Sequence, residues 1–117
     1  MAARIDHLMA AVFMADDTTR LAQLAAHVAP AFVYVSRSAV VDGAQGLSDA
    51  FSHYRHEAGR HAALHRTSAV DLHHGYFRYA WVRTEDDAAP AGGWSFGQLD
   101  AEGRITRIVS FDELRPA

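Results

Sequence analysis

The sequence predicts an α+β domain in which helices cover one face of a curved, largely antiparallel sheet. Two observations lead to this fold class. Apart from a short alternating stretch at residues 31–36, apolar residues recur every three or four positions up to about residue 58, and every second position from about residue 64 onwards. The chain has 117 residues, close to the commonest domain size, so we expect residues 1–117 to form one domain.

Two apolar stripes at helical spacing open the chain. The first spans residues 3–14 and comprises Ile5, Leu8, Met9, Val12 and Phe13. Asp16, Asp17 and Thr18 interrupt it and offer side-chain oxygens that can cap a second helix. That second helix carries Leu21, Leu24, Ala25 and Val28. We expect it to end at Pro30, because proline has no amide hydrogen and clashes with the preceding turn.

A short strand and a third helix follow. Residues 31–36 alternate, so Phe32, Tyr34 and Ser36 should face one side of the sheet. A turn at Asp42 and Gly43 leads into the third helix. Its apolar stripe consists of Leu47, Ala50, Phe51, Tyr54 and Ala58, and Gly59 offers a C-terminal stop.

The second half of the chain has the pattern of an antiparallel meander. We expect strands over residues 66–72, 76–84, 93–99 and 105–112. A polar loop over residues 85–92, which contains Pro90 and Gly92, separates the second of these strands from the third.

The turn between the last two strands permits a prediction of register. Residues 100–103 fit a type I turn with Gly103 in the left-handed bulge position. Counting back from this turn pairs Leu99 with Ile105 and Ser95 with Val109.

This register divides the last two strands into two faces. Phe111 shares the face of Ser95, and Trp94, Phe96 and Ile108 fall on the opposite face. A single layer of helices covers only one face of a sheet. We therefore expect a homodimer formed through the face that carries Trp94, Phe96 and Ile108.

Composition and charge exclude several classes of partner. The net charge is −3 with neutral histidine, and the eleven basic residues, all arginine, are scattered along the chain. Nucleic-acid binding needs a concentrated positive surface, so we expect no nucleic-acid partner. No apolar run approaches the ~20 residues of a membrane span, so we expect no membrane partner. The lack of cysteine and of a signal-peptide pattern favours a cytoplasmic location, and the lack of lysine and asparagine indicates a bacterial genome rich in GC.

The sequence predicts neither a metal site nor a cofactor. His53 and His56 have i, i+3 spacing but lie near the solvated end of the third helix. His73 and His74 are neighbours in an expected strand, so their side chains should point to opposite faces and cannot share an ion. No cysteine or carboxylate cluster completes a site, and phosphate-loop and dinucleotide-binding glycine motifs are absent from the sequence.

Three stretches in this order carry a family resemblance: residues 31–36 with 41–43, residues 68–81, and the close from Gly103–Arg104–Ile105 to Phe111–Asp112. Together they resemble the SnoaL-like branch of the nuclear transport factor 2-like superfamily over essentially the whole chain. The resemblance implies a cone, in which a strongly curved antiparallel or mixed sheet wraps around N-terminal helices and leaves a pocket at the wide end. Members include ketosteroid isomerases, polyketide cyclases, epoxide hydrolases and dehydratases, so the fold does not decide the reaction.

The resemblance also indicates where catalytic groups would lie. Ketosteroid isomerases of this fold use a tyrosine on the first helix, a base aspartate after the first strand and an aspartate on the penultimate strand. These positions fall near Met9, Ser36 and Ser95, and SnoaL-type cyclases likewise place an acid where this chain has Ser95. A serine hydroxyl cannot act alone as a general base near pH 7, so we expect neither activity to carry over.

Two sets of side chains compete for the pocket face of the strand at residues 76–84. One register points His73, Phe77, Tyr79 and Trp81 inward, with Trp81 opposite Ser95; a one-residue slip points His74, Tyr76 and Arg78 inward instead. We favour the first set, because three alternating aromatic residues suit the face that the helices cover. The ligand-binding candidates are then Tyr34, Ser36, Tyr54, Phe77, Trp81, Ser95 and Phe111.

The sequence thus favours a small homodimeric cone-fold protein that binds a small hydrophobic or aromatic metabolite in an apolar pocket. The alternative is an isomerase- or cyclase-type enzyme that acts by proton transfer on a carbonyl compound. In that case His73 or Tyr79 is the titratable group. The lack of a carboxylate at the expected pocket positions is the feature that favours binding over catalysis.

Overall fold

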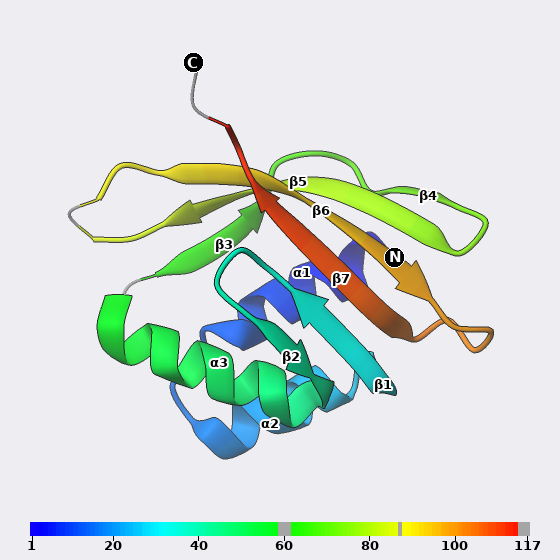
Figure 1. Cartoon of the computed structure of the whole chain (residues 1–117), viewed down its shortest axis with the longest axis horizontal. Coiled ribbons are helices and arrows are strands. Elements are labelled where there is room, and N and C mark those ends of the chain that lie inside the picture. Colours follow the sequence, from blue (N-terminus) through cyan, green and yellow to red (C-terminus); the bar gives the residue numbers. More distant parts are fainter. Residues whose placement is uncertain (59–61, 87, 115–117) are drawn as a thin grey trace.

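The computed structural model describes residues 1–58, 62–86 and 88–114, and within them three helices pack against a seven-stranded curved sheet. Figure 1 shows the helices gathered on one side of the sheet. The elements are α1 (Ala2–Val12), α2 (Asp17–Ala25), β1 (Val28–Val35), β2 (Val40–Asp42), α3 (Gly43–Ala58), β3 (Ala63–Arg66), β4 (Asp71–His73), β5 (Tyr76–Thr84), β6 (Ala91–Leu99) and β7 (Ile105–Asp112).

The sheet is mixed, with the strand order β2-β1-β7-β6-β5-β3 and with β4 also paired to β5. The pair β1–β7 is parallel, and the other strand pairs are antiparallel. The expected α+β cone with a mixed sheet is therefore confirmed. None of the helices in the described part of the chain is long and apolar enough to cross a membrane.

The second helix is shorter than the sequence predicts. Its N-cap is confirmed, because the Thr19 amide donates to Asp16 Oδ2 at 2.8 Å. The helix ends at Ala25, however, and Val28 and Pro30 belong to β1, so the prediction that Pro30 terminates a helix is wrong. Pro30 lies in the stretch of β1 where the register against β7 shifts, and there it removes no hydrogen bond of a regular ladder.

The strand expected over residues 66–72 is two short strands, β3 and β4, which pair with opposite halves of β5. Between them the chain stays attached to β5. The Thr67 amide donates to the Ala80 carbonyl at 2.9 Å, and the Ala80 amide donates to Ser68 Oγ at 2.8 Å. The bounds expected for β5 and β7 are confirmed, whereas Gly59, expected to stop α3, lies outside the described residues.

Because of a β-bulge, the register between the last two strands differs from the predicted one. Gly103 has φ +81°, and Leu99 pairs with Ile105 as predicted. The register then shifts between Gln98 and Leu99, so Ser95 pairs with Ser110 and not with Val109. Inward and outward positions on β7 are thereby exchanged. Ile108, expected on the outer face, is 3% exposed, and Phe111, expected beside Ser95, is 59% exposed on the outer face.

The inward face of β5 carries the aromatic set that the sequence favours. Phe77, Tyr79 and Trp81 are buried, whereas Tyr76 is exposed. Tyr79, not Trp81, pairs with Ser95, which is a shift of two residues that leaves the faces unchanged. The core around this face is completed by Ile5, Leu8, Leu24, Phe32, Leu47, Ile105 and Ile108.

Candidate functional site

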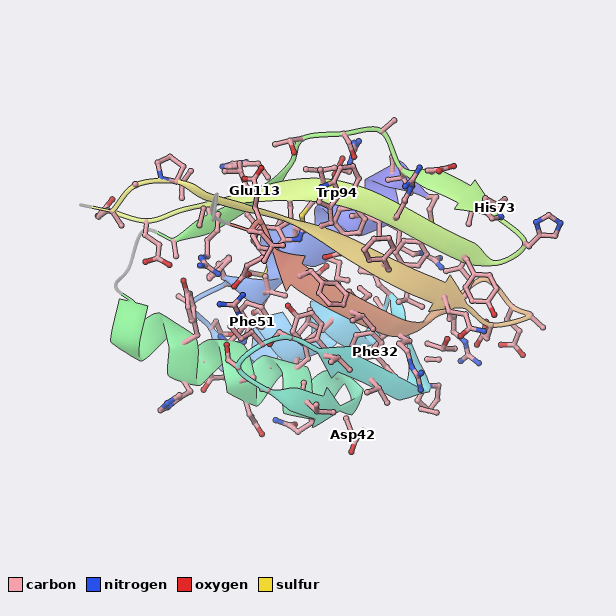
Figure 2. The ribbon with its side chains drawn as sticks, turned by 45° about the horizontal axis from the view of Figure 1, so that its top comes forward. Phe32, Asp42, Phe51, His73, Trp94 and Glu113 are labelled. Carbon is pink, nitrogen blue, oxygen red and sulfur yellow. The ribbon has the colours of Figure 1, made fainter. Side chains whose placement is uncertain are left out.

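A cavity of about 630 Å³ lies between α1, α3 and the concave face of the sheet. This volume is within the range of pockets that hold small molecules. Its apolar wall comes mainly from the two helices: Leu8, Met9 and Val12 of α1, Phe13 after it, and Leu47, Ala50 and Phe51 of α3. Phe13 and Phe51 meet edge to face, with ring centroids 5.4 Å apart. Phe51 lies on the helix side of the sheet, between α3 and β7, in Figure 2.

Two glycines on β6 shape the sheet side of the cavity. Gly93 pairs with Trp81, and Gly97 pairs with Phe77. A Cβ atom at Gly93 would lie 2.3 Å from Trp81 Cζ2, and one at Gly97 would lie 2.1 Å from Phe77 Cζ. The aromatic rings therefore lie directly over glycine backbone, which lets large side chains cover the sheet without filling the space above Ser95.

A row of hydroxyl groups crosses the floor of the cavity. Tyr79 of β5 pairs with Ser95 of β6, and Ser95 pairs with Ser110 of β7. Ser95 Oγ lies 2.8 Å from Ser110 Oγ. Tyr79 is hydrogen-bonded to Ser95 and Tyr34 to Ser110, which extends the row at both ends. We call these four residues, Tyr34, Ser110, Ser95 and Tyr79, the hydroxyl row.

Burial fixes the protonation state of the two tyrosines. It raises the pKa of Tyr79 to about 12, although the hydrogen bond with Ser95 opposes part of this shift. Burial also raises the pKa of Tyr34, with the Ser110 hydrogen bond opposing it. Both phenols therefore remain protonated at neutral pH, and neither serves as a base.

Charged residues surround the mouth of the cavity. Arg37 Nε lies 3.7 Å from Asp112 Oδ2, and Arg83 Nε lies 3.2 Å from Glu85 Oε1. The Arg83 guanidinium also stacks 5.7 Å above the ring of Tyr54, whose hydroxyl donates to Glu85. Among the described residues that line the cavity, Asp112 is the one carboxylate.

The structure brings together most of the residues that the sequence singles out. Tyr34, Ser36, Tyr54, Trp81 and Ser95 line the cavity, and so do Met9 and Tyr79. Phe77 is buried in the core but is not among the lining residues. Phe111 lies on the outer face because of the β7 bulge.

His73 is not in the cavity. It pairs with Tyr76 in β4–β5 and is exposed, so the prediction that it shares the face of Phe77 and Tyr79 is wrong. Figure 2 shows His73 at the end of β4, far from Phe51. The physical reason is the tight turn at His74 and Gly75, which puts His73 on the face of its partner Tyr76, whereas unbroken alternation from residue 73 to residue 77 would put it on the face of Phe77.

Sequence reasoning missed Ser110, Asp112, Arg37 and Arg83 as lining residues. The alternation of β7 carries the signal for Ser110 and Asp112, but only once the bulge near Leu99 is known. Of the histidines considered for a metal, His53 lines the cavity, and the side chain of His56 lies outside the described part.

Comparisons with known proteins fit this geometry at the level of the fold. No protein-family model and no curated protein matches the chain. A candidate isomerase of the SnoaL-like family from Agrobacterium tumefaciens strain C58 aligns with a TM-score of 0.86 and 23% identity, covering 97% of each chain. A candidate SnoaL-like polyketide cyclase from Jannaschia sp. CCS1 has a TM-score of 0.73 and 13% identity, covering 96% of this chain and 84% of the other.

A candidate polyketide cyclase from Sinorhizobium meliloti gives the same TM-score, 0.73, at 12% identity, with 95% of each chain covered. Likeness at such low identity extends to the fold and not to the reaction. The architecture inferred from the three sequence stretches is thereby confirmed. This chain therefore has the same curved-sheet cone fold as these solved SnoaL-like structures.

Proposed function

We propose that this protein binds a small, largely apolar molecule that presents an oxygen atom to the hydroxyl row. The observation that carries the proposal is the row itself, a line of paired hydroxyls on the floor of an otherwise apolar cavity. The four hydroxyls are joined by three hydrogen bonds, which use three of their four protons, and the buried Trp81 Nε1 on the cavity wall has no hydrogen-bond partner among the described residues. An unpaired donor is costly to bury, so the cavity favours a ligand with an acceptor oxygen.

The chemistry of the cavity narrows the ligand class. Tyr34 and Tyr79 remain protonated, so the four hydroxyls of the row keep one O–H proton beyond their three mutual hydrogen bonds, and this proton can be donated to an acceptor such as a carbonyl oxygen. Phe13, Phe51 and Trp81 offer flat apolar surfaces to the rest of the molecule. An aromatic or alicyclic ketone of two or three rings has these properties and fits the volume.

A matched pair of ligands tests this proposal. We expect 2-acetylnaphthalene to bind more tightly than 2-ethylnaphthalene in isothermal titration calorimetry, because only the ketone accepts a hydrogen bond. Tyr79→Phe should reduce that difference by about 0.5–1.5 kcal/mol, or roughly two- to tenfold in affinity. Tyr76→Phe is the control, since Tyr76 lies on the same strand and is exposed outside the cavity. Equal binding of the two ligands by the unmodified protein would contradict the proposal.

A second candidate function is proton transfer on a bound ketone, and Asp112 is the observation that favours it. A base could remove a proton from the carbon next to the carbonyl, while the hydroxyl row donates to the developing oxyanion. Tyr79 is then a donor and not the base, because its pKa is about 12. His73 cannot reach the cavity, so Asp112 at the mouth takes the role of base.

Hydrogen exchange measures this second function directly. In D₂O the unmodified protein should accelerate deuteration of the acetyl methyl group of 2-acetylnaphthalene, followed by proton NMR. Asp112→Asn should abolish the acceleration and leave binding of the ketone nearly unchanged. An exchange rate equal to buffer alone would leave the protein as a binding module and exclude catalysis by Asp112.

We also propose that the protein forms a homodimer through its outer face. The sheet carries an apolar patch there, composed of Trp94, Phe96, Val109 and Phe111. Trp94 is 44% exposed, and the rings of Phe96 and Phe111 meet edge to face at 6.1 Å. Ile108, which the sequence assigned to this interface, is in the core and is not part of the patch.

A further inference from the structure

The β4–β5 hairpin turns on two residues in left-handed backbone conformation. His74 has φ +52° and Gly75 has φ +79°, and His73 and Tyr76 are paired on either side of them. These values are those of a type I′ turn, the usual two-residue connection of a hairpin. The Leu99 amide donates to the Gly75 carbonyl at 2.7 Å, which fixes the turn against the end of β6.

This turn brings together two imidazoles that a regular strand would separate. In a regular strand neighbouring side chains point to opposite faces, but the left-handed residue at position 74 redirects its side chain. The Nδ1 atoms of His73 and His74 lie 3.2 Å apart, and the ring planes make an angle of 78°. The expectation that these two side chains point to opposite faces is therefore wrong.

The separation of the two nitrogens matches that of two ligands on one metal ion. Imidazole nitrogens bind such ions at about 2.0–2.1 Å, so two of them lie about 3.3 Å apart at a tetrahedral angle, as on Zn²⁺, and about 2.9 Å apart at the right angle of a square-planar ion such as Cu²⁺. The observed 3.2 Å lies between these two separations. Both side chains are exposed, so an ion can approach from solvent. Imidazole suits Zn²⁺, Ni²⁺ and Cu²⁺, and Cu²⁺ is bound most tightly in the general order of affinities.

We propose that His73 and His74 form a binding site for a divalent transition-metal ion, which the two Nδ1 atoms chelate and for which Cu²⁺ is the preferred ion. Asp71, two residues before His73, is held by Arg78 at 3.0 Å. In the described part of the chain, no three His, Cys, Asp or Glu side chains are grouped so that they could hold a metal ion. The site therefore has two protein ligands, and water or donor atoms of another molecule complete the coordination.

Copper titration of the full chain tests the site. In a weakly coordinating buffer at pH 7.4, CuCl₂ should bind with an electron paramagnetic resonance signal of nitrogen ligation. His73→Gln and His74→Asn should each weaken binding at least about tenfold, since losing a ligand costs no less than losing a group that merely supports one. His74→Asn preserves the hairpin, because Asn-Gly is a favoured type I′ pair. An unchanged melting temperature shows that this variant folds.

Two further measurements make the result specific to this pair. His65→Gln is the control, because His65 is an exposed histidine on β3 and should not affect affinity. Cu²⁺ at substoichiometric amounts should broaden the NMR signals of residues 72–76 first. Equal affinity of the unmodified protein and His74→Asn, or broadening centred on other histidines, would overturn the proposal and leave the pair as a hydrogen bond between two imidazoles.

Discussion

Arg20 is the charged side chain most completely enclosed in the described part of the chain, at 1% exposure. Its Nε donates to Ser48 Oγ at 3.0 Å, its Nη1 donates to the Met14 carbonyl at 2.6 Å, and its Nη2 bonds Asp17. These contacts join the start of α2 to α3 and to the end of α1. One guanidinium thus positions the helices that form the roof of the cavity.

Replacing Arg20 should destabilise the protein. Arg20→Met keeps much of the side-chain volume but leaves Ser48 and the Met14 carbonyl without their partner, at a cost of about 1–3 kcal/mol. Arg78→Met is the matched control, because Arg78 makes an exposed ion pair with Asp71 that contributes about 0–1 kcal/mol. Urea denaturation measures both. A similar decrease in the free energy of unfolding in both variants would show that the buried Arg20 contacts stabilise the protein no more than an exposed ion pair does.

His27 predicts a dependence of stability on pH. Its pKa is lowered chiefly by burial and further by the charges of Arg4 and His7. The unfolded chain therefore binds a proton at about pH 6.5, whereas the folded protein binds it only at lower pH. The stability that neutral His27 contributes is present above pH ~6.5 and is lost as the pH falls toward the folded pKa.

Substitution of His27 checks this sign. His27→Gln should flatten the decline in the free energy of unfolding between pH 7 and pH 5, measured by urea denaturation at several pH values. His65→Gln, which changes an exposed histidine on β3, should leave the decline as it is. A steeper decline in His27→Gln would contradict the assigned direction of the pKa shift.

At the scale of elements, β6 shows how a strand can build a cavity. Its inward positions hold Gly93, Ser95 and Gly97, which pair with Trp81, Tyr79 and Phe77. Aromatic rings pack over the two glycines, and Ser95 is part of the hydroxyl row. Small residues opposite large ones keep the sheet covered and the space above it open.

Gly97→Ala should therefore be destabilising. The new Cβ would lie 2.1 Å from Phe77 Cζ, so the ring must move within a packed core, at a cost of about 1–3 kcal/mol. Gly46→Ala is a control with the opposite sign. Gly46 lies in α3, where the added Cβ meets Val41 at an ordinary 3.5 Å, and alanine in a helix gains about 0.5–1 kcal/mol over glycine. A neutral Gly97→Ala would show that Phe77 has room to move.

The elements also show what a sequence can and cannot predict. Alternation within one strand placed Tyr34, Ser36 and Ser95 on the cavity side, because side-chain direction in a strand depends only on local parity. The predicted face was wrong for residues that follow a bulge or a turn. The bulge near Leu99 exchanged the faces of Ile108 and Phe111, and the turn at His74 moved His73 out of the cavity. The bulge has no strong local signal in the residue types, whereas Gly75, between two expected strands, is a signal for the turn.

For the molecule as a whole, the cone leaves its two surfaces unequally covered. The helices and the cavity occupy the concave face, and the convex face keeps an apolar patch in solvent. The patch continues beyond Phe96 and Val109, since Val35 pairs with Val109 on β7 and with Val40 on the edge strand β2. Val40 is 69% exposed, so the apolar surface reaches the edge of the sheet.

This surface predicts a homodimer that depends on Trp94 and Phe111. Complete burial of an aromatic side chain covers about 150–250 Å², and the three rings of the patch are about half exposed in the single chain. The rings and their copies therefore supply on the order of 600 Å², about half of the lower end of the 1,200–2,000 Å² that a stable interface needs, and neighbouring residues such as Val40 must supply the rest. Trp94→Glu with Phe111→Glu would place four carboxylates in the interface and should give a monomer by size-exclusion chromatography with light scattering. Both side chains are exposed in the single chain, so the monomer should keep its fold and its far-ultraviolet circular dichroism. Gln23→Glu on the exposed side of α2 is the charge control and should remain dimeric. A stable dimer in the double variant would place the interface elsewhere, and a monomeric unmodified protein at micromolar concentration would exclude the dimer itself.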